Sequence, residues 1–206
     1  MNNPAESEKA EKKGVFKRNL VKMLAVGFIA VMAAPAPPAG AATNAGGKKV
    51  LTVFYSRTGN TRDLAGIIQA GVGGDIVELE TVDPYPEAYR ASTEQAKKEL
   101  EANYFPPLKN GIESIAQYDV IFVGSPIWWG TFAAPVRGFL AGHDFTGKTV
   151  VPFITHEGSG LGKSMADLKA LCPGATVLPG LAVRGGRAGS AQNEVAEWLK
   201  SIRLGD

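Results

Sequence analysis

Residues 50–61 read Val-Leu-Thr-Val-Phe-Tyr-Ser-Arg-Thr-Gly-Asn-Thr, and this stretch decides how the rest of the chain is interpreted. Its first half, Val50–Tyr55, is an apolar run of strand length with apolar residues on both faces. Such a run is typical of a strand buried between two layers of helices. The polar second half leads into a helical apolar stripe that begins at Leu64, so the segment predicts a strand, a tight loop and a helix.

The same alternation of strands and helices continues to the end of the chain. Four more strands are predicted at Ile76–Leu79, Val120–Val123, Val150–Ile154 and, with a weaker pattern, Thr176–Val183. Apolar residues at spacings of 3, 4 and 7 predict helices between them, and a further helix is predicted over Tyr89–Ala102, between two proline-containing segments. Strands that alternate with helices predict an α/β fold with a doubly wound, five-stranded parallel sheet and helices on both faces.

The loop after the first strand carries the features of a phosphate site. In a doubly wound sheet, ligands bind beyond the carboxyl ends of the strands. Residues 56–61 bring together several hydroxyls and one glycine, directly before a helix whose first N–H groups have no backbone partners. This arrangement predicts a site for a terminal phosphate. The alternative is a simple helix cap by Asn60 or Thr61, which needs only one polar side chain.

The sequence Ser-Arg-Thr-Gly-Asn-Thr at residues 56–61 matches the [ST]-x-T-G-x-T phosphate loop of flavodoxins, in the same place between the first strand and first helix. From Lys48 to Ile202 the chain resembles that family, and in particular the flavodoxin-like group with a P-I-W-W-G loop. The resemblance implies FMN as the cofactor and a sheet order of 2-1-3-4-5. It also implies that FMN binds where the winding of the sheet reverses.

Two further loops are interpreted through this resemblance. Trp128 and Trp129, after the third strand, need a flat apolar cover such as a flavin ring, although one of them could instead pack under the following helix. The resemblance implies that the Gly130 peptide can turn toward the flavin N5. The glycine-rich loop after the fourth strand would hold the pyrimidine edge, and it contains no second stacking aromatic residue unless His156 takes that place. Arg57 departs from the usual uncharged phosphate loop and would neutralise part of the phosphate charge.

The residues predicted to bind the cofactor lie in these three loops. They are Ser56, Arg57, Thr58, Gly59, Asn60, Thr61, Pro126, Ile127, Trp128, Trp129, Gly130, Thr155, His156, Gly158, Ser159 and Gly160. No catalytic residue and no metal ligand is predicted.

The resemblance implies an electron carrier that exchanges electrons with redox partner proteins, because the cofactor itself performs the redox step. The alternative on the same fold is an NAD(P)H-dependent quinone or flavin reductase, which needs room over the flavin face. We expect Trp128 and Trp129 to cover that face, which favours the carrier.

Two segments imitate a nucleotide-binding P-loop. Residues 142–149 satisfy G-x-x-x-x-G-K-T, but they follow a predicted helix and precede a strand, whereas a P-loop follows a strand and opens a helix. In residues 157–164, Glu157 takes the place of the first glycine and would put a carboxylate where phosphate oxygens lie. Neither is interpreted as a nucleotide site. Cys172 is the single cysteine, which excludes an internal disulfide and a cysteine-only metal site, and we expect it to be buried and inert.

The sequence divides into residues 1–42, a linker at 43–47 and an FMN-binding domain at 48–206. A basic start, the short apolar run Met23–Ala34 and the small residues 39–42 match a secretory signal peptide. An uncleaved membrane anchor is the alternative, although the run is short for a bilayer. Residues 17–22 resemble a twin-arginine signal with Lys17 in place of the first arginine, and an ordinary secretory signal is the other option. We therefore expect export to the periplasm or anchoring outside the cytoplasm, with membrane contact only through this segment.

The formal net charge of +2 is unevenly distributed. Residues 1–42 hold six basic and three acidic side chains, so the rest of the chain holds 16 basic and 17 acidic ones. A body so close to neutral offers no field for nucleic acid. Flavodoxins are commonly strongly acidic, so long-range steering toward a redox partner is expected to be weaker here.

Overall fold

A computed structural model describes residues 43–44 and 47–204. The segment predicted to be a signal peptide or anchor, residues 1–42, lies outside the described residues. Within the expected linker, Thr43–Asn44 forms a short strand, β1, that pairs antiparallel with Lys48 and Lys49. In the described part of the chain, no helix is both long and apolar enough to cross a membrane.

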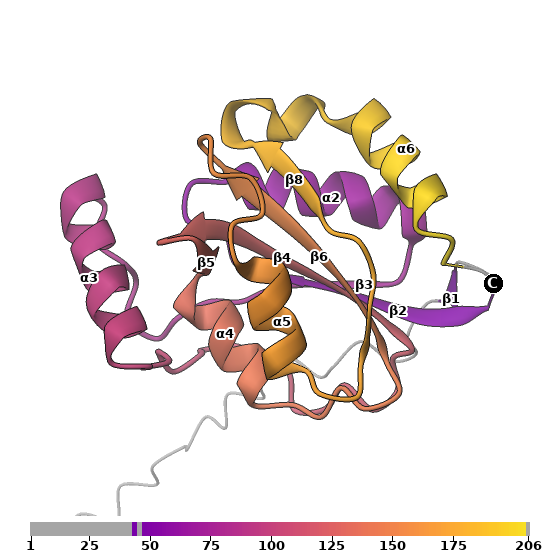
Figure 1. The fold of residues 1–206 in the computed structure, drawn as a ribbon, viewed down its shortest axis with the longest axis horizontal. Coiled ribbons are helices and arrows are strands. Elements are labelled where there is room, and N and C mark those ends of the chain that lie inside the picture. Colours follow the sequence, from indigo (N-terminus) through magenta and orange to yellow (C-terminus); the bar gives the residue numbers. More distant parts are fainter. Residues whose placement is uncertain (1–42, 45–46, 205–206) are drawn as a thin grey trace, which may run out of the picture. The chain divides into compact units, whose positions relative to one another are not determined.

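The parallel strands form one twisted sheet, as predicted (Figure 1). They are β2 (Lys48–Phe54), β3 (Asp75–Glu78), β4 (Val120–Trp128), β6 (Thr149–His156), β7 (Thr176–Val177) and β8 (Leu181–Arg184). β2 lies between β3 and β4, and β6 lies between β4 and the pair β7 and β8. Counted along the chain, this is the order 2-1-3-4-5, so the prediction is confirmed.

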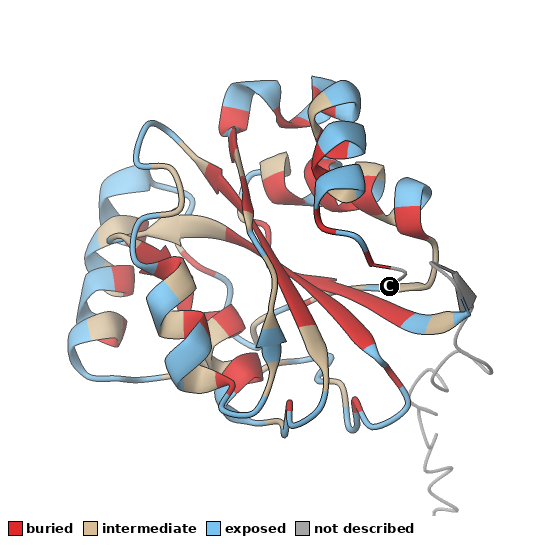
Figure 2. Cartoon of the chain, turned by 45° about the vertical axis from the view of Figure 1, so that its right-hand side comes forward, coloured by how far each residue is buried: buried red, intermediate tan, exposed pale blue. Residues whose placement is uncertain are grey.

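Helices cover both faces of the sheet because its central strands are apolar on both sides. α2 (Asn60–Val72) and α6 (Gln192–Ser201) pack on one face, together with Val50 and Phe54 of β2. α4 (Ala134–Ala141) and α5 (Ser164–Leu171) pack on the other face, together with Leu51 and Val53. Buried residues therefore run along the strands between the two helical layers (Figure 2).

The fifth strand differs from the prediction, because Thr176–Val183 is not continuous. β7 ends at Val177 and β8 begins at Leu181, and Pro179 lies between them. Proline has no backbone N–H and cannot donate to the sheet ladder, so the strand breaks there. A 3-10 helix at Gly185–Ser190 then leads from β8 to α6.

β4 and β6 are longer than predicted, because both continue into residues interpreted as loops. Ser125 and Pro126 still pair with Ile154 and Thr155 of β6. β4 then turns back through a hairpin into β5 (Thr131–Phe132), which the sequence analysis missed. The apolar run of β4 is interrupted by Gly124, Ser125 and Pro126, and β6 ends in the polar residues Thr155 and His156, so the apolar pattern stopped before the strands did.

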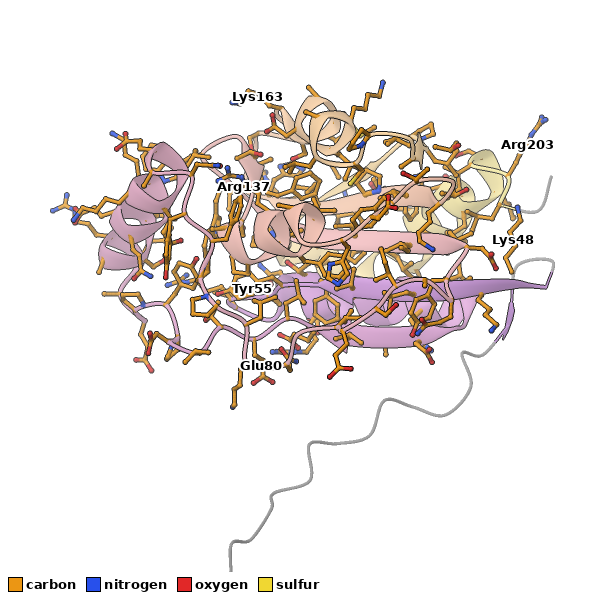
Figure 3. All side chains as sticks on the ribbon, turned by 90° about the horizontal axis from the view of Figure 1, so that it is seen from below. Lys48, Tyr55, Glu80, Arg137, Lys163 and Arg203 are labelled. Atoms are coloured by element: carbon orange, nitrogen blue, oxygen red, sulfur yellow. The ribbon has the colours of Figure 1, made fainter. Side chains whose placement is uncertain are left out.

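The long crossover between β3 and β4 carries α3 (Tyr89–Glu101), which begins at the predicted residue and ends one residue early. Arg137 on α4 points toward the segment that follows α3, and its guanidinium donates to Asn103 Oδ1 at 2.6 Å (Figure 3). α3 therefore lies beside α4, away from the helices that cover the opposite face of the sheet (Figure 1).

Candidate functional site

A cavity of about 620 Å³ lies at the carboxyl ends of β2, β4 and β6. Twelve of the sixteen predicted site residues line it: Arg57, Thr58, Asn60, Thr61, Pro126, Ile127, Trp128, Trp129, Thr155, His156, Gly158 and Ser159. The structure therefore brings the three predicted loops together around one space. Ser56, Gly59, Gly130 and Gly160 do not line the cavity.

The loop after β2 presents a free helix terminus. Gly59 is the N-cap of α2, with φ of +97°, and no side chain caps the helix. The alternative in which Asn60 or Thr61 caps the helix is therefore wrong. The first bond of the helix runs from the Asp63 N–H to the Gly59 carbonyl, so the N–H groups of residues 60–62 have no partner within the helix. Ser56 shapes this loop, since its Oγ accepts the Gly59 N–H at 3.2 Å.

The carboxyl end of β6 is joined to this helix terminus. The hydroxyls of Thr61 and Thr155 form a buried hydrogen bond of 2.8 Å. At the last residue of β6, His156 Nδ1 accepts the N–H of Gly158 at 2.9 Å, which closes a tight turn. His156 lines the cavity from this turn.

Arg57 lines the cavity, but its guanidinium has a partner within the protein. Arg57 Nη2 donates to the carbonyl of Glu87 at 2.7 Å, just before α3. The predicted role in neutralising phosphate charge therefore competes with a tether to the crossover segment.

The hairpin between β4 and β5 has a two-residue turn at Trp129 and Gly130, with φ of +51° and +82°. Positive φ at both positions is typical of a type I′ turn, which glycine tolerates and tryptophan does not favour. The Gly130 carbonyl accepts the N–H of Lys163 at 2.7 Å. The resemblance implied that the Gly130 peptide can turn toward the flavin, and turning this carbonyl into the cavity would break the bond to Lys163.

The two tryptophans have different surroundings. Trp128 packs edge-on against Tyr55 and Tyr85, with ring centroids 5.6 and 4.8 Å away. Trp129 is 51% exposed, and its indole N–H donates to the carbonyl of Thr93 on α3 at 3.0 Å. Trp128 is therefore partly buried against two tyrosines beside the cavity, and neither tryptophan is shown packing under the following helix.

Burial raises the pKa values of Tyr55 and Tyr85, the two tyrosines that pack against Trp128. Desolvation raises the pKa of Tyr55 to about 12. Desolvation also raises the pKa of Tyr85, and so does its hydrogen bond to the buried carboxylate of Glu99. Both phenols therefore remain protonated at neutral pH and pack as neutral aromatic groups next to the cavity.

One wall of the cavity was not predicted from the sequence. Tyr89, Ser92, Thr93 and Ala96 line it from α3, at positions i, i+3, i+4 and i+7 on one face of that helix. Small and hydroxyl-bearing residues leave no apolar stripe, so the spacing was the one available signal. Glu157 and Gly185 also line the cavity and were not predicted.

A family model described as Flavodoxin matches residues 49–202. The chain belongs to the flavodoxin family. Among solved structures, this flavodoxin-family chain is similar to a protein assigned as a flavoprotein from Bacteroides eggerthii DSM 20697. The two share 32% identity with a TM-score of 0.67, over 75% of this chain and 98% of the other. A second such protein, from Bacteroides uniformis ATCC 8492, has 29% identity and a TM-score of 0.66, over 75% and 99% of the two chains.

A flavoprotein from Lactobacillus acidophilus NCFM, crystallised in complex with FMN, is 23% identical with a TM-score of 0.57. That match covers 72% of this chain and 99% of the other. At this identity the likeness to the flavodoxin-family chain establishes the common fold.

The positions of the two segments that imitate a P-loop exclude both of them as nucleotide-binding sites. Residues 142–149 lie between α4 and β6, as expected. In residues 157–164, the N–H groups of Lys163 and Ser164 are bound to the carbonyls of Gly130 and Leu161, so they are not free to hold phosphate. Cys172 is buried, and desolvation raises its pKa to about 12, as expected for an inert thiol.

Proposed function

We propose that this chain binds FMN in the cavity and functions as an electron-transfer flavodoxin. The observation that carries the proposal is the N-terminus of α2, where the N–H groups of residues 60–62 lack helix partners beside the cavity. Such a terminus suits a phosphate dianion, because unpaired N–H groups and the positive end of the helix dipole favour negative charge. Family membership and the FMN-bound neighbour support the same cofactor.

The remaining walls fit a long ligand with a flat ring. Thr58 and Asn60 lie at the phosphate end, and the hairpin with Trp128 and Trp129 offers aromatic surface at some distance along the cavity wall. The loop after β6 supplies a backbone that can approach the ring closely. Bound FMN would supply reversible electron storage, and the protein's part is to bind and orient it.

The visible absorption spectrum of the purified protein tests this proposal. We expect flavin bands that remain after gel filtration, or that appear when the apoprotein is mixed with FMN. Replacing Asn60 with proline would remove one of the free N–H groups and a polar side chain, and we expect weaker FMN binding in that variant. A protein that takes up no FMN would refute the proposal.

For the electron donor and acceptor, we propose redox partner proteins, as the carrier interpretation implies, with only weak long-range steering toward them because the body is nearly neutral. A reductase that acts on a small molecule is the second candidate, because α3 adds the hydroxyl groups of Tyr89, Ser92 and Thr93 to the cavity. Mixing the oxidised holoprotein with NADPH alone separates the two. Slow or absent bleaching of the flavin supports the carrier, and rapid bleaching supports the reductase.

We also propose that residues 1–42 direct export, on the strength of their sequence pattern alone. If the twin-arginine interpretation holds, Arg18→Lys should leave the protein in the cytoplasm. Normal export of that variant, measured by cell fractionation, would favour an ordinary secretory signal.

A further inference from the structure

Two of the predicted cofactor loops hold the crossover segment that carries α3, each by a side chain that donates to a backbone carbonyl. Arg57, in the loop after β2, donates to the Glu87 carbonyl at 2.7 Å. Trp129, at the tip of the hairpin, donates its indole N–H to the Thr93 carbonyl at 3.0 Å. Both bonds end on the backbone of the crossover segment, so its attachment to these loops does not depend on the identity of the residues that accept them.

Little hydrophobic burial holds α3 in place. The residues that it buries are Ser92, Ala96 and Glu99, and none of them is a large apolar side chain. Helices in proteins usually gain most of their stability from an apolar face packed against the rest of the fold. The position of α3 therefore depends strongly on its polar contacts.

Trp129 is the contact at the centre of the helix. Its backbone adopts the left-handed conformation, which a large side chain disfavours, and its ring is half exposed. The bond to Thr93 and the ammonium of Lys97, 5.4 Å from the ring centroid, offset that cost. Both interactions join the hairpin to α3.

The same helix face that Trp129 holds also lines the cavity. Ser92 and Ala96 are 3% and 6% exposed, and they line the cavity together with Tyr89 and Thr93. A displacement of α3 would therefore open one wall of the space in which the cofactor is proposed to bind.

We propose that Trp129 and Arg57 are positioning residues that dock α3 as a wall of the FMN site, so that docking of α3 and binding of FMN stabilise each other. This inference rests on the proposed function. In this proposal the long crossover between β3 and β4 also contributes to cofactor binding, in addition to the loops after β2, β4 and β6. By linkage, FMN must lower the equilibrium constant for opening of α3 by the same factor by which docking of α3 tightens FMN binding.

Trp129→Phe is the test, because it removes the indole N–H and keeps an aromatic ring. Trp198→Phe is the matched control, since the indole of Trp198 donates to the Pro179 carbonyl, also at 3.0 Å, but on the opposite face of the sheet. Two measurements are made on each protein: hydrogen exchange of residues 89–101, without FMN and with saturating FMN, and the Kd for FMN by fluorescence titration.

For Trp129→Phe we expect α3 to exchange about threefold to tenfold faster in the apoprotein, as for the loss of one hydrogen bond. FMN should slow this exchange in both proteins, and the Kd for FMN should rise by no more than the same factor, because it depends on the fraction of apoprotein in which α3 is docked. Trp198→Phe should change neither quantity relative to the wild type. If Trp129→Phe does not fold, Lys97→Met removes the cation over the ring while Trp129 stays in place, and we expect the same direction of change.

Unchanged exchange of α3 in Trp129→Phe would overturn the inference. Exchange of α3 that added FMN does not slow would overturn it too, because α3 would then be held by Trp129 without being a wall of the FMN site. Failure of the wild type to bind FMN would overturn the proposed function instead. The two failures are distinguishable because exchange is also measured without FMN.

Discussion

Thr61 and Thr155 share a buried hydroxyl–hydroxyl hydrogen bond of 2.8 Å that joins the first turn of α2 to the carboxyl end of β6. The two residues are 1% and 4% exposed, and both line the cavity. The bond therefore sets the distance between the proposed phosphate end of the site and the loop proposed to hold the ring edge. Neither residue alone could be assigned this role from the sequence.

Thr61→Val should weaken both the fold and the site. It keeps the shape of the side chain but leaves the Thr155 hydroxyl buried without this partner, which costs about 1–3 kcal/mol. We expect the free energy of unfolding in urea to fall by about that amount and the Kd for FMN to rise about tenfold. In a double-mutant cycle with Thr155→Val, the two effects should be less than additive, and additive effects would contradict a direct bond.

Thr52→Val should raise the free energy of unfolding, whereas Thr61→Val should lower it. The Thr52 hydroxyl is fully buried on β2 and has no hydrogen-bond partner in the described part of the chain. Replacing an unsatisfied buried hydroxyl with a methyl group of similar shape removes a desolvation cost, so we expect stabilisation of about 1 kcal/mol. Urea denaturation measures it, and since Thr52 does not line the cavity, FMN affinity should stay unchanged. A destabilised variant would show that the hydroxyl is satisfied in solution.

The sequence predicted the sheet correctly because apolar runs on both strand faces, as in Val50–Phe54, can be satisfied only between two helical layers. It predicted the strand ends poorly. β4 and β6 continue through Ser125 and Thr155, where the backbone pairing persists after the apolar pattern has ended. The strand breaks at Pro179 because proline has no backbone N–H to donate to the sheet. The weak apolar pattern over Thr176–Val183 did not show this break.

For the site, sequence motifs located the three loops but not the partners of their side chains. Arg57 and Trp129 were assigned to the cofactor, and the structure shows both donating to carbonyls near or in α3. Such contacts depend on where the long crossover folds back, which no local pattern encodes. The wall formed by Ser92 and Ala96 was missed for the same reason, since their small side chains have no hydrophobic period.

Gly130→Ala should destabilise the hairpin. Gly130 has φ of +82°, and a Cβ there would meet nothing within 4 Å, so the cost is conformational and not steric. We expect a loss of about 1–2 kcal/mol in the free energy of unfolding. Gly66→Ala is the matched control, because a Cβ on this helical residue of α2 also meets nothing. Gly66→Ala should raise the free energy of unfolding by about 0.5–1 kcal/mol. Equal effects of the two substitutions would contradict the turn geometry at Gly130.

The tyrosines beneath the hairpin predict a loss of stability at alkaline pH. Burial raises the pKa of Tyr55 from 10.0 to about 12 in the folded protein. Below pH 10 the phenol is protonated in both states, so its contribution is fully present. Between pH 10 and 12 the unfolded chain releases the proton and the folded protein does not, so the free energy of unfolding falls as pH rises.

Urea denaturation at pH 8, 10 and 11.5 measures this dependence, and Tyr55→Phe removes the titrating group. We expect the stability of Tyr55→Phe to decline less between pH 10 and 11.5 than that of the wild type, by roughly 1–2 kcal/mol. Tyr104→Phe is the control, because the Tyr104 side chain is half exposed and its loss should leave the decline unchanged. Parallel curves for Tyr55→Phe and the wild type would mean that the Tyr55 phenol is as accessible to water in the folded protein as in the unfolded chain. That result would contradict its packing against Trp128.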